Sequence, residues 1–376
     1  MRVLYYTDSL RLGGKERQLV ELLKGLKQVG GMELLLVCMD QGEFYEPDVH
    51  ALSIPLKYLF RKSRWDPRVL YGFYRLAKEF RPDVIHTNCM MSSAYALPTA
   101  KLMGVPLING SIRNCFQSAT TRWKVERALL ALSDFRIANS TAGLRSRGFS
   151  PESPRDFVIH NGLDLSRAQD AAASIGHDGN GHDQVGMIAE FRPDKDFKTF
   201  LLAARRVVNS RPNVTFMTVG DGETLAAMKE LAGDAGGRIQ FLGRRKDVEK
   251  IISSFSVGVL STFTEGISNS IMEYMVMAKP VIASDCAGSR EIVLEGKTGF
   301  LVPPQDPEAL ADRIAFLLDD PDEARRMGEA GRKHIEENFS LKTMVDKTVE
   351  IYERAMRSQN RRGFREEPAR SRLRNA

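Results

Sequence analysis

Residues 3–29 read VLYYTDSLRLGGKERQLVELLKGLKQV, and this stretch decides the expected fold. Residues 3–7 are a short apolar run rich in strand-forming residues, which predicts a buried strand. Within residues 16–29, leucines recur at the i, i+3, i+4, i+7 spacing of one helix face, at Leu19, Leu22, Leu23 and Leu26. A strand followed by such a helix predicts the opening of a Rossmann-like unit with a parallel sheet.

The same alternation continues along the first part of the chain. Further strands are predicted at residues 34–38, 84–86, 106–108, 135–138 and 157–160, with helical stretches between most of them. Residues 176–183 then read GHDGNGHD, a composition that packed elements do not favour. We therefore predict a first domain at residues 1–165 and a junction between residues 161 and 183.

After the junction the pattern restarts and predicts a second domain at residues 183–339. Strands are expected at residues 185–189, 214–219, 239–242, 257–260 and 281–283, and helices at residues 197–208, 223–231, 247–254 and 307–319. A last helix at about residues 340–357 is expected to pack back on the first domain. The predicted fold class is α/β, with two Rossmann-like doubly wound domains facing across a cleft. Ligands of such sheets bind at the carboxyl ends of the strands.

Composition excludes several other classes of protein. The chain has 376 residues, too many for one ordinary compact domain. No stretch approaches the ~20 apolar residues that span a bilayer, and residues 1–7 lack the features of a secretion signal, so we expect a soluble or peripheral protein. The cysteines lack the CxxC spacing of a metal site and indicate no disulfide framework, which favours the reducing cytosol. They are Cys38, Cys89, Cys115 and Cys286.

Most of the formal charge of +6 comes from the end of the chain. From residue 357 onward, seven arginines outweigh Glu366 and Glu367. We expect residues 358–376 to form a disordered basic tail, because they carry too few apolar side chains to offset the entropy of ordering them. Such a tail can contact anionic lipid or simply keep the protein soluble.

Two common nucleotide-binding signatures are absent. The turn after Thr7 contains only Gly13 and Gly14, not the GxGxxG of a dinucleotide site. The triplet 296–298, Gly-Lys-Thr, resembles the end of a P-loop, but Glu291 occupies the position of the leading glycine. Gly13 and Gly14 nevertheless precede a helix, where exposed backbone N–H groups can approach a phosphate or a sugar. The alternative is a flexible turn with a helix cap.

The strongest local signal is the segment 265–273, Glu-Gly-Ile-Ser-Asn-Ser-Ile-Met-Glu, which follows a predicted strand and enters a helix. Backbone donors at the helix start suit a diphosphate, and the carboxylates of Glu265 and Glu273 suit pairs of sugar or ribose hydroxyls. The alternative is a capping box formed by Ser270 and Glu273, which leaves Glu265 unexplained.

A diphosphate also requires cations. Arg192 and Lys195 follow the predicted strand 185–189 and precede a helix, so they lie at the same sheet edge as Glu265. There they can neutralise the charge of a leaving diphosphate. The alternative for either residue alone is a solvated loop charge.

Taken together, these motifs resemble glycosyltransferase family 4, whose members have the two-domain GT-B architecture. The resemblance covers nearly the whole chain, because the motifs occur in family order. In the first part of the chain, Gly13-Gly14-Lys15-Glu16 is similar to the family's GG-x-E, residues 82–86 to its PDvvH and residues 161–164 to its NG-x-D. In the second part, residues 192–195 are similar to its phosphate-binding stretch and residues 265–273 to its E-x7-E motif. Residues 279–283 and 298–302 then follow as the family pattern has them.

The resemblance implies transfer of a sugar from a nucleotide-diphosphate donor, with a UDP-sugar favoured over a GDP-sugar. Configuration at the anomeric carbon would be retained, with no metal and no cofactor besides the nucleotide-sugar substrate. The implied catalytic residues are Lys195, Glu265 and His86. The implied donor-binding residues are Gly13, Gly14, Arg192, Lys195, Arg244, Gly266, Ile267, Ser268, Asn269 and Glu273. Among these, Arg244 would lie near the base, and Glu273 would hold the ribose hydroxyls.

Three departures from the family pattern bear on this assignment. Glu190 stands where the family arginine is usual, so Arg192 is expected to replace it. His86-Thr87-Asn88 stands where His-x-His is frequent, and His86 is either a sugar contact or a buried structural residue. Ile267 and Ser268 stand where Phe and Gly are usual, at positions that the resemblance associates with the choice of sugar.

Basic residues lie among aromatic ones in the first domain. Such stretches suit an anionic membrane surface or a lipid-linked acceptor, and the alternative is charged helix faces over core aromatics. The two stretches are Lys57, Tyr58, Phe60, Arg61, Lys62, Arg64, Trp65, Arg68, Tyr71, Phe73 and Tyr74, and then Arg113, Phe116, Arg122, Trp123, Lys124 and Arg127.

The sequence therefore predicts a cytoplasmic glycosyltransferase, peripheral at the inner face of the membrane. Its expected partners are a nucleotide-sugar and a glycan or lipid-linked acceptor of polysaccharide or glycolipid synthesis. No nucleic acid is expected. The alternatives are a sugar-nucleotide epimerase of the same fold and a non-catalytic subunit that binds nucleotide-sugars.

Overall fold

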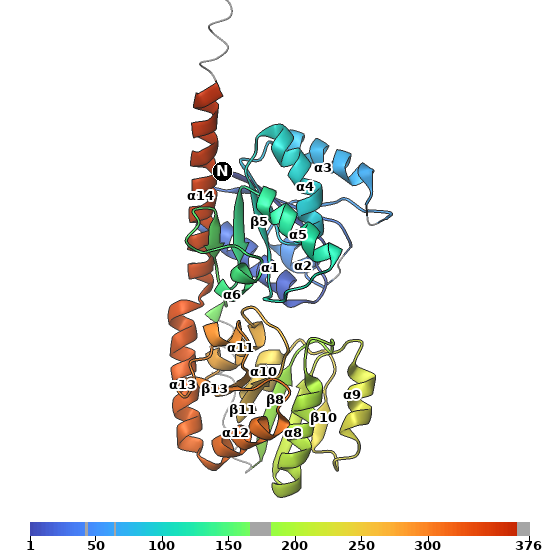
Figure 1. Ribbon diagram of the computed structural model, residues 1–376, viewed down its shortest axis with the longest axis vertical. Coiled ribbons are helices and arrows are strands. Elements are labelled where there is room, and N and C mark those ends of the chain that lie inside the picture. The colour runs from blue at the N-terminus through green and yellow to red at the C-terminus, as the bar shows by residue number, and fades with distance from the viewer. Residues whose placement is uncertain (42–43, 64, 166–181, 367–376) are drawn as a thin grey trace, which may run out of the picture. The chain divides into compact units, whose positions relative to one another are not determined.

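The computed structural model describes residues 1–41, 44–63, 65–165 and 182–366. The chain forms two compact units, which are described separately (Figure 1). The first comprises Met1–Gly162 together with the segment from Leu341 onward, and the second comprises Leu163–Ser340. The second unit is therefore inserted into the sequence of the first.

The first unit is a parallel sheet with strand order β3-β2-β1-β4-β5-β6-β7. The strands are β1 (Arg2–Thr7), β2 (Glu33–Cys38), β3 (Leu56–Tyr58), β4 (Val84–Thr87), β5 (Leu107–Ile112), β6 (Phe135–Ala138) and β7 (Asp156–Val158). The helices are α1 (Gly14–Val29), α2 (Glu46–Ala51), α3 (Pro67–Phe80), α4 (Met90–Met103), α5 (Thr121–Leu132), α6 (Thr141–Ser146) and α14 (Leu341–Glu366). Figure 1 shows helices on both faces of this sheet.

Two hydrophobic cores hold this sheet between its helices. On one face, Leu19 and Leu23 of α1 and Tyr352 of α14 pack with Tyr5 of the central strand β1. On the other face, Phe73 of α3 belongs to a second core. Each fully buried large apolar side chain stabilises the fold by roughly 1.5–3 kcal/mol. Because α14 supplies core residues, the last helix is an integral part of the first unit.

The second unit is a parallel sheet with strand order β10-β9-β8-β11-β12-β13. The strands are β8 (Asp183–Ile188), β9 (Val214–Val219), β10 (Ile239–Phe241), β11 (Val257–Leu260), β12 (Val281–Ser284) and β13 (Gly299–Val302). The helices are α8 (Phe197–Ser210), α9 (Leu225–Ala232), α10 (Val248–Ser253), α11 (Asn269–Val276), the short 3-10 helix η1 (Ser289–Glu291), α12 (Pro307–Asp319) and α13 (Pro321–Asn338).

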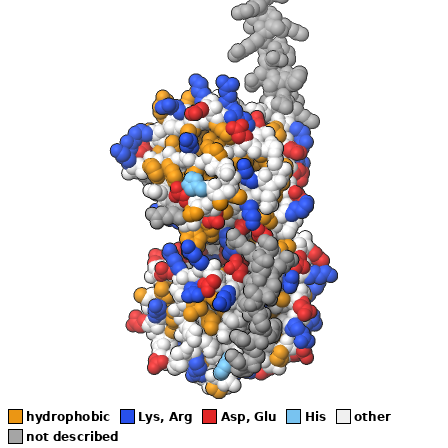
Figure 2. Space-filling model, turned by 180° about the vertical axis from the view of Figure 1, so that it is seen from behind, with side chains coloured by type: hydrophobic (Ala, Val, Ile, Leu, Met, Phe, Trp, Pro, Cys, Tyr) orange, Lys and Arg blue, Asp and Glu red, His pale blue; other side chains and the backbone are white. Residues whose placement is uncertain are grey.

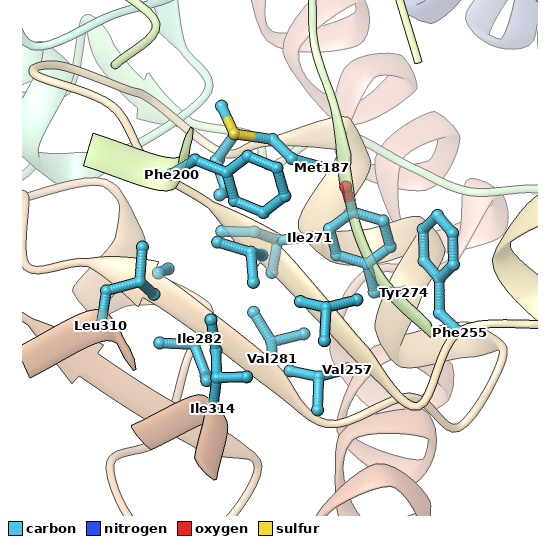
Figure 3. Close-up of a cluster of buried hydrophobic side chains, with 14 of the residues drawn as sticks. Met187, Phe200, Phe255, Val257, Ile271, Tyr274, Val281, Ile282, Leu310 and Ile314 are labelled. Carbon is cyan, nitrogen blue, oxygen red and sulfur yellow. The ribbon is translucent and has the colours of Figure 1, made fainter. Parts of the chain in front are cut away.

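The core of the second unit fixes α11 to the sheet. Ile271 and Tyr274 of this helix are fully buried beside Val257 and Val281 of the two neighbouring strands (Figure 3). The Tyr274 hydroxyl accepts a hydrogen bond from the backbone N–H of Ile188, at 2.7 Å, at the end of β8. This anchoring sets the position of the first turn of α11, which enters the candidate site.

The predicted class of two Rossmann-like parallel-sheet domains is confirmed. Two short strands were not predicted: β3, which has only three residues at the sheet edge, and β13, whose residues 299–302 were read only as a motif.

The last helix runs to Glu366, past its predicted end at residue 357, so the part of the predicted tail up to Glu366 is helical. Arginine, glutamine and glutamate favour helices, and this preference outweighs the low apolar content there. The rest of the predicted tail lies outside the described residues, and no helix among those described is both long enough and apolar enough to span a membrane.

Candidate functional site

Two loops at the carboxyl edge of the second sheet are held side by side by backbone hydrogen bonds. The loop after β8 and the loop after β11 are joined by Asp196 N–H to the carbonyl of Ser261, at 3.1 Å, and by Phe263 N–H to the carbonyl of Asp194, at 3.0 Å. The Thr262 hydroxyl also donates to the carbonyl of Asp194, at 2.9 Å. These bonds place Lys195, which lies between Asp194 and Asp196, next to the segment 262–265.

Lys195 and Glu265, predicted from separate motifs, form an ion pair between the ammonium group and Oε2. Their side chains are 15% and 16% exposed, so solvent screens the pair only partly. An arriving diphosphate would share the Lys195 ammonium with Glu265, and Glu265 would gain freedom to accept a hydroxyl hydrogen bond. The structure therefore brings together a cation and a carboxylate that can exchange partners when a ligand binds.

The helix α11 begins at the other end of the same segment. Its N-cap is Ser268, whose side chain makes no capping hydrogen bond, and Ser270 lies inside the helix. The capping-box alternative for Ser270 and Glu273 is therefore wrong, because the helix begins two residues earlier than a Ser270 cap requires. Glu273 is 6% exposed, in the second turn of the helix.

Ile267 does not present its side chain to a ligand. It is 2% exposed and belongs to the hydrophobic core of the second unit. Its side chain is therefore held in the core, and the predicted sugar contacts of this stretch would have to come from the backbone.

Gly288, which the sequence analysis did not single out, packs closely against this backbone. A Cβ on Gly288 would lie 2.2 Å from the carbonyl oxygen of Gly266 and 2.3 Å from that of Glu265. Real Cβ atoms do not approach backbone oxygens this closely, so only glycine lets the two segments pass. No local pattern signals this role, because the contact joins residues that are distant in the sequence.

Arg192 and Arg244 lie on exposed loops of the same edge. Arg192 is 53% exposed and pairs with Asp194 at 2.9 Å and with Glu190 at 3.8 Å. Arg244 pairs with Asp221 at 3.5 Å. The two loops are connected, because the Phe191 N–H donates to the Asp221 carbonyl at 3.0 Å. Exposed pairs of this kind contribute little to stability and can be exchanged for a ligand. The backbone of Arg192 also contacts that of Lys195, because the Lys195 N–H donates to the Arg192 carbonyl at 3.0 Å.

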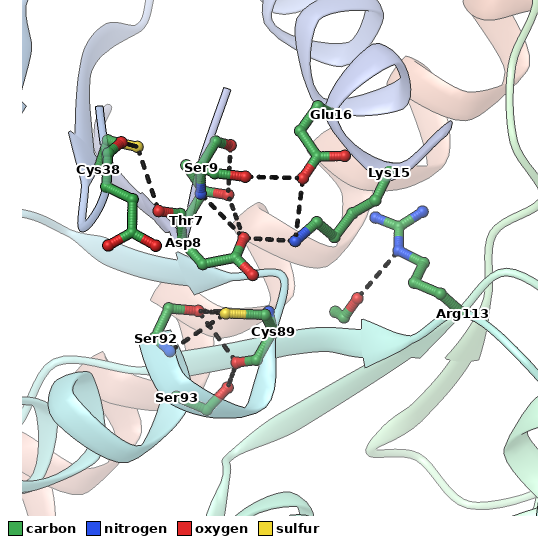
Figure 4. Close-up of polar contacts among 12 residues, drawn as sticks. Thr7, Asp8, Ser9, Lys15, Glu16, Cys38, Cys89, Ser92, Ser93 and Arg113 are labelled. Atoms are coloured by element: carbon green, nitrogen blue, oxygen red, sulfur yellow. Dashed lines mark hydrogen bonds and ion pairs between the residues drawn. The ribbon is translucent and has the colours of Figure 1, made fainter. Parts of the chain in front are cut away.

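In the first unit, Gly13 is the N-cap of α1, with extended backbone. A Cβ there would lie 2.4 Å from Oε2 of Glu16, so the glycine lets the Glu16 carboxylate fold back over the helix start. Lys15 forms ion pairs with Asp8 and, at 3.2 Å, with Glu16 (Figure 4). Burial opposes a charged Lys15, but these two carboxylates outweigh it and raise its pKa. The partner Asp8 was missed by the sequence analysis, because nothing in its own neighbourhood marks it.

His86 lies in the interior of the first unit, 2% exposed. Its Nδ1 shares a hydrogen bond of 2.8 Å with the hydroxyl of Tyr352 in α14. Burial, with the positive charge of Arg113, lowers the pKa of His86 to about 3, so the ring is neutral at ordinary pH. A neutral ring is poorly suited to act as a general acid, but it can still donate or accept a hydrogen bond, so the catalytic role of His86 stays a prediction.

Histidine and acidic residues do not gather into a metal site in the described part of the chain, where no group of three or more potential ligands occurs. Of the two histidines of the predicted junction, His177 lies outside the described residues.

Two family models match the chain, one to each part. A model described as "Glycosyltransferase Family 4" matches residues 12–167, and one described as "Glycosyl transferases group 1" matches residues 182–320. The two matches follow one another in the same order as the two predicted domains.

Individual proteins are similar over most of their length. The UDP-Gal:alpha-D-GlcNAc-diphosphoundecaprenol alpha-1,3-galactosyltransferase of Escherichia coli is 24% identical over 89% of this chain and 95% of its own. The lipopolysaccharide core biosynthesis mannosyltransferase LpcC of Rhizobium leguminosarum bv. viciae is 29% identical over 77% of this chain and 83% of its own. Among solved structures, Anabaena HepE in complex with UDP-glucose superposes with a TM-score of 0.82, at 21% identity, over 93% of this chain and 99% of its own.

Proposed function

Because the chain belongs to glycosyltransferase family 4, we propose that it transfers a hexosyl group from a nucleotide-diphosphate sugar to a glycan or lipid-linked acceptor. The acceptor would belong to polysaccharide or glycolipid synthesis in the cytoplasm. The observation that carries the proposal is the Lys195–Glu265 ion pair beside the first turn of α11. It combines a cation for a diphosphate with a carboxylate for sugar hydroxyls at the edge where ligands of parallel sheets bind.

The proposed roles are those that the resemblance to the family implies. Lys195, with Arg192, binds the diphosphate and stabilises the charge that develops on it as the leaving group departs. Glu265 and the backbone of residues 266–269 hold the sugar. Glu273 holds the ribose hydroxyls, Arg244 lies near the base, and the Gly13–Gly14 turn of the first unit supplies backbone donors.

The proposed chemistry retains configuration and needs no metal. The bond between the anomeric carbon and the diphosphate oxygen breaks, and the acceptor oxygen bonds to the same carbon from the same face. The acceptor proton passes to the leaving diphosphate. In this scheme the protein supplies position and positive charge, and Lys195 is the residue that does both.

The similar proteins favour UDP over GDP in the donor. HepE was solved with UDP and with UDP-glucose, and the E. coli relative is named for UDP-galactose. The same relative is named for an acceptor on diphosphoundecaprenol, which supports a lipid-linked acceptor for this chain.

A nucleotide panel tests the donor. We expect UDP to raise the melting temperature of the full chain by roughly 5–10 °C at 100 times its Kd, since such binding contributes about 2.7 kcal/mol. GDP and ADP at equal concentration should give smaller shifts. Thermal shift measurements with uridine as the control report whether the diphosphate is needed. If no nucleotide diphosphate changes the melting temperature, the proposed function is wrong.

A membrane surface is a further proposed partner. In the first unit, Phe60, Trp65, Tyr71 and Phe116 are each at least 55% exposed, whereas the predicted Phe73 is in the core. On the face shown in Figure 2, basic side chains lie next to hydrophobic ones over this unit. Exposed aromatic rings beside lysine and arginine suit the interface of an anionic bilayer.

Vesicle binding tests this surface. We expect the protein to co-sediment with anionic vesicles at low salt and to dissociate as ionic strength rises, because screening weakens the attraction. The double variant Phe60→Ser/Trp65→Ser should bind less, and Phe316→Ser, at a 43% exposed site of the second unit, serves as the control. Equal sedimentation with neutral and anionic vesicles, or with none, would argue against the proposal.

Two other functions make different predictions. An epimerase would convert the donor without an acceptor, so incubation of the protein with UDP-sugar alone distinguishes it. A non-catalytic subunit would bind the donor through Lys195 and Glu273 without turnover. The exchangeable ion pair favours the transferase, because a leaving diphosphate needs a cation that can strengthen its contact during the reaction.

A further inference from the structure

Arg113 carries a partly buried positive charge that no carboxylate neutralises directly. It follows β5, and its Nε donates to the carbonyl of Gly110 at 3.2 Å while Nη1 donates to Oδ1 of Asn161 at 3.4 Å. Within the described residues, no carboxylate lies at ion-pair distance from its guanidinium, and its Nη2 makes no hydrogen bond. Burial lowers the pKa of Arg113, a sign that its charged form lacks full compensation.

Several neutral polar atoms nearby are also without partners. Nε2 of His86, both amide atoms of Asn88 and the hydroxyl of Tyr5 are buried and make no hydrogen bond in the described structure. Tyr5 and His86 are paired across β1 and β4, and Asn88 lies two residues beyond His86, on the same face of the sheet. Each such group costs about 1–3 kcal/mol unless a ligand or water satisfies it.

Gly110 connects these atoms with the guanidinium. A Cβ on Gly110 would lie 2.9 Å from Nε2 of His86, and the Gly110 carbonyl accepts the hydrogen bond from Arg113. Thr87, the last residue of β4, pairs with Asn109 of β5. The next residue on each segment, Asn88 just after β4 and Gly110 within β5, therefore lies beside the other. The unpartnered atoms therefore gather where these two strands end.

Charges of both signs surround this cluster: Lys15 is paired with Asp8 and Glu16, and Glu16 also interacts with Arg113 through space. Burial raises the pKa of Tyr5 to about 12, and the charges of Arg113 and Lys15 both act in the opposite direction. Lys15 is already paired with Asp8 and Glu16, which leaves Arg113 as the cation available to a ligand.

We propose that Arg113, His86, Asn88 and Tyr5 form a binding site for an oxyanion, a phosphate or carboxylate group carried by the acceptor substrate. The proposal rests on the proposed function and names the class of acceptor, an anionic one. The guanidinium offers Nη2, and Asn88 and Tyr5 offer an amide and a hydroxyl donor. His86 donates from Nε2 in the tautomer whose Nδ1 accepts the hydrogen bond from the Tyr352 hydroxyl. The donor diphosphate is proposed to bind Lys195 in the second unit, and this site of the first unit is proposed for a different anion.

Binding of inorganic pyrophosphate to the full chain, measured calorimetrically with saturating UDP present, tests the site. UDP fills the proposed donor site, so pyrophosphate reports on a second one. We expect wild-type protein to bind it, and Arg113→Gln to weaken binding roughly 10- to 100-fold. Arg145→Gln, at an exposed arginine of α6, should bind as wild type does. UDP affinity should be the same in all three proteins.

A second variant guards against a folding defect. Asn88→Leu keeps the branching of the asparagine side chain and removes an amide that makes no hydrogen bond, so a folded variant should keep its UDP affinity. It should still weaken pyrophosphate binding several-fold. Wild-type affinity for pyrophosphate in both Arg113→Gln and Asn88→Leu would overturn the site, as would the absence of binding to UDP-loaded wild type. If the wild-type protein did not bind UDP at all, that result would instead contradict the proposed function.

A comparison of acceptors tests whether the bound anion is a sugar phosphate or a lipid headgroup. With a sugar 1-phosphate and the matching methyl glycoside, Arg113→Gln should raise KM for the phosphate only, while kcat/KM for the neutral sugar stays unchanged. A lipid-linked diphosphate acceptor that is affected more than the sugar 1-phosphate would assign the site to a lipid headgroup. Equal effects on the charged and the neutral acceptor would show that Arg113 only supports the fold and would refute the site.

Discussion

Lys195→Ala is expected to lower kcat/KM for sugar transfer about 10²- to 10³-fold. Removing a single preorganised group that stabilises developing negative charge has an effect of this size in other enzymes. Here the loss falls on the leaving diphosphate, whose charge increases as its bond to the sugar breaks. Initial rates with the donor identified by the nucleotide panel would measure the effect.

Matched variants isolate this charge. Lys198→Ala removes an exposed lysine of α8, three residues away, and should leave the rate unchanged. Lys195→Arg keeps the charge and should recover part of the activity. The double variant Lys195→Ala/Glu265→Ala measures how strongly the ion pair couples, because neighbouring residues are not additive. Full activity of Lys195→Ala would exclude Lys195 from the reaction.

Gly288→Ala is expected to damage both stability and donor binding. The new Cβ would meet the carbonyl oxygens of Glu265 and Gly266 at 2.3 and 2.2 Å, and backbone atoms cannot move aside as a flexible side chain does. Overpacking of this kind destabilises a protein by typically 1–3 kcal/mol. The strain falls on the segment proposed to hold the sugar, so donor affinity should fall as well.

The control for this change is Gly72→Ala, inside α3. Its Cβ would meet only the side chain of Leu59, at 2.9 Å, which can rotate away, and alanine favours a helix. We expect Gly72→Ala to keep the melting temperature and the UDP affinity of wild type. A Gly288→Ala protein that melts and binds UDP like wild type would show that the segment 265–266 is free to shift.

The fold could be read from the sequence because its signals are local and repeated. The leucines of α1 at helical spacing and the apolar run that became β1 identify a strand and a helix without any knowledge of the rest. The short strand β3 escaped prediction, because three residues at an edge carry almost no periodicity. The extent of α14 also escaped, since apolar content alone does not decide where a charged helix ends.

The candidate site was predictable only where motifs and topology coincide. Lys195 and Glu265 follow the ends of β8 and β11, which are neighbours in the sheet, and the structure brings them together. The support from Gly288, the tie between His86 and Tyr352 and the core position of Ile267 depend on contacts between residues distant in sequence. Such contacts arise from tertiary packing, and a local sequence pattern does not predict them.

The position of α14 also has a consequence for the order in which the protein folds during synthesis. Met344, Val345, Ile351, Tyr352 and Ala355 complete a core whose other members, from Val3 to Ile159, leave the ribosome first. The second unit, Leu163–Ser340, is made in between and can fold while the first unit still lacks its last helix. The core of the first unit is therefore completed only once this helix has been made, and until then the apolar side chains that pack against the helix lack that cover.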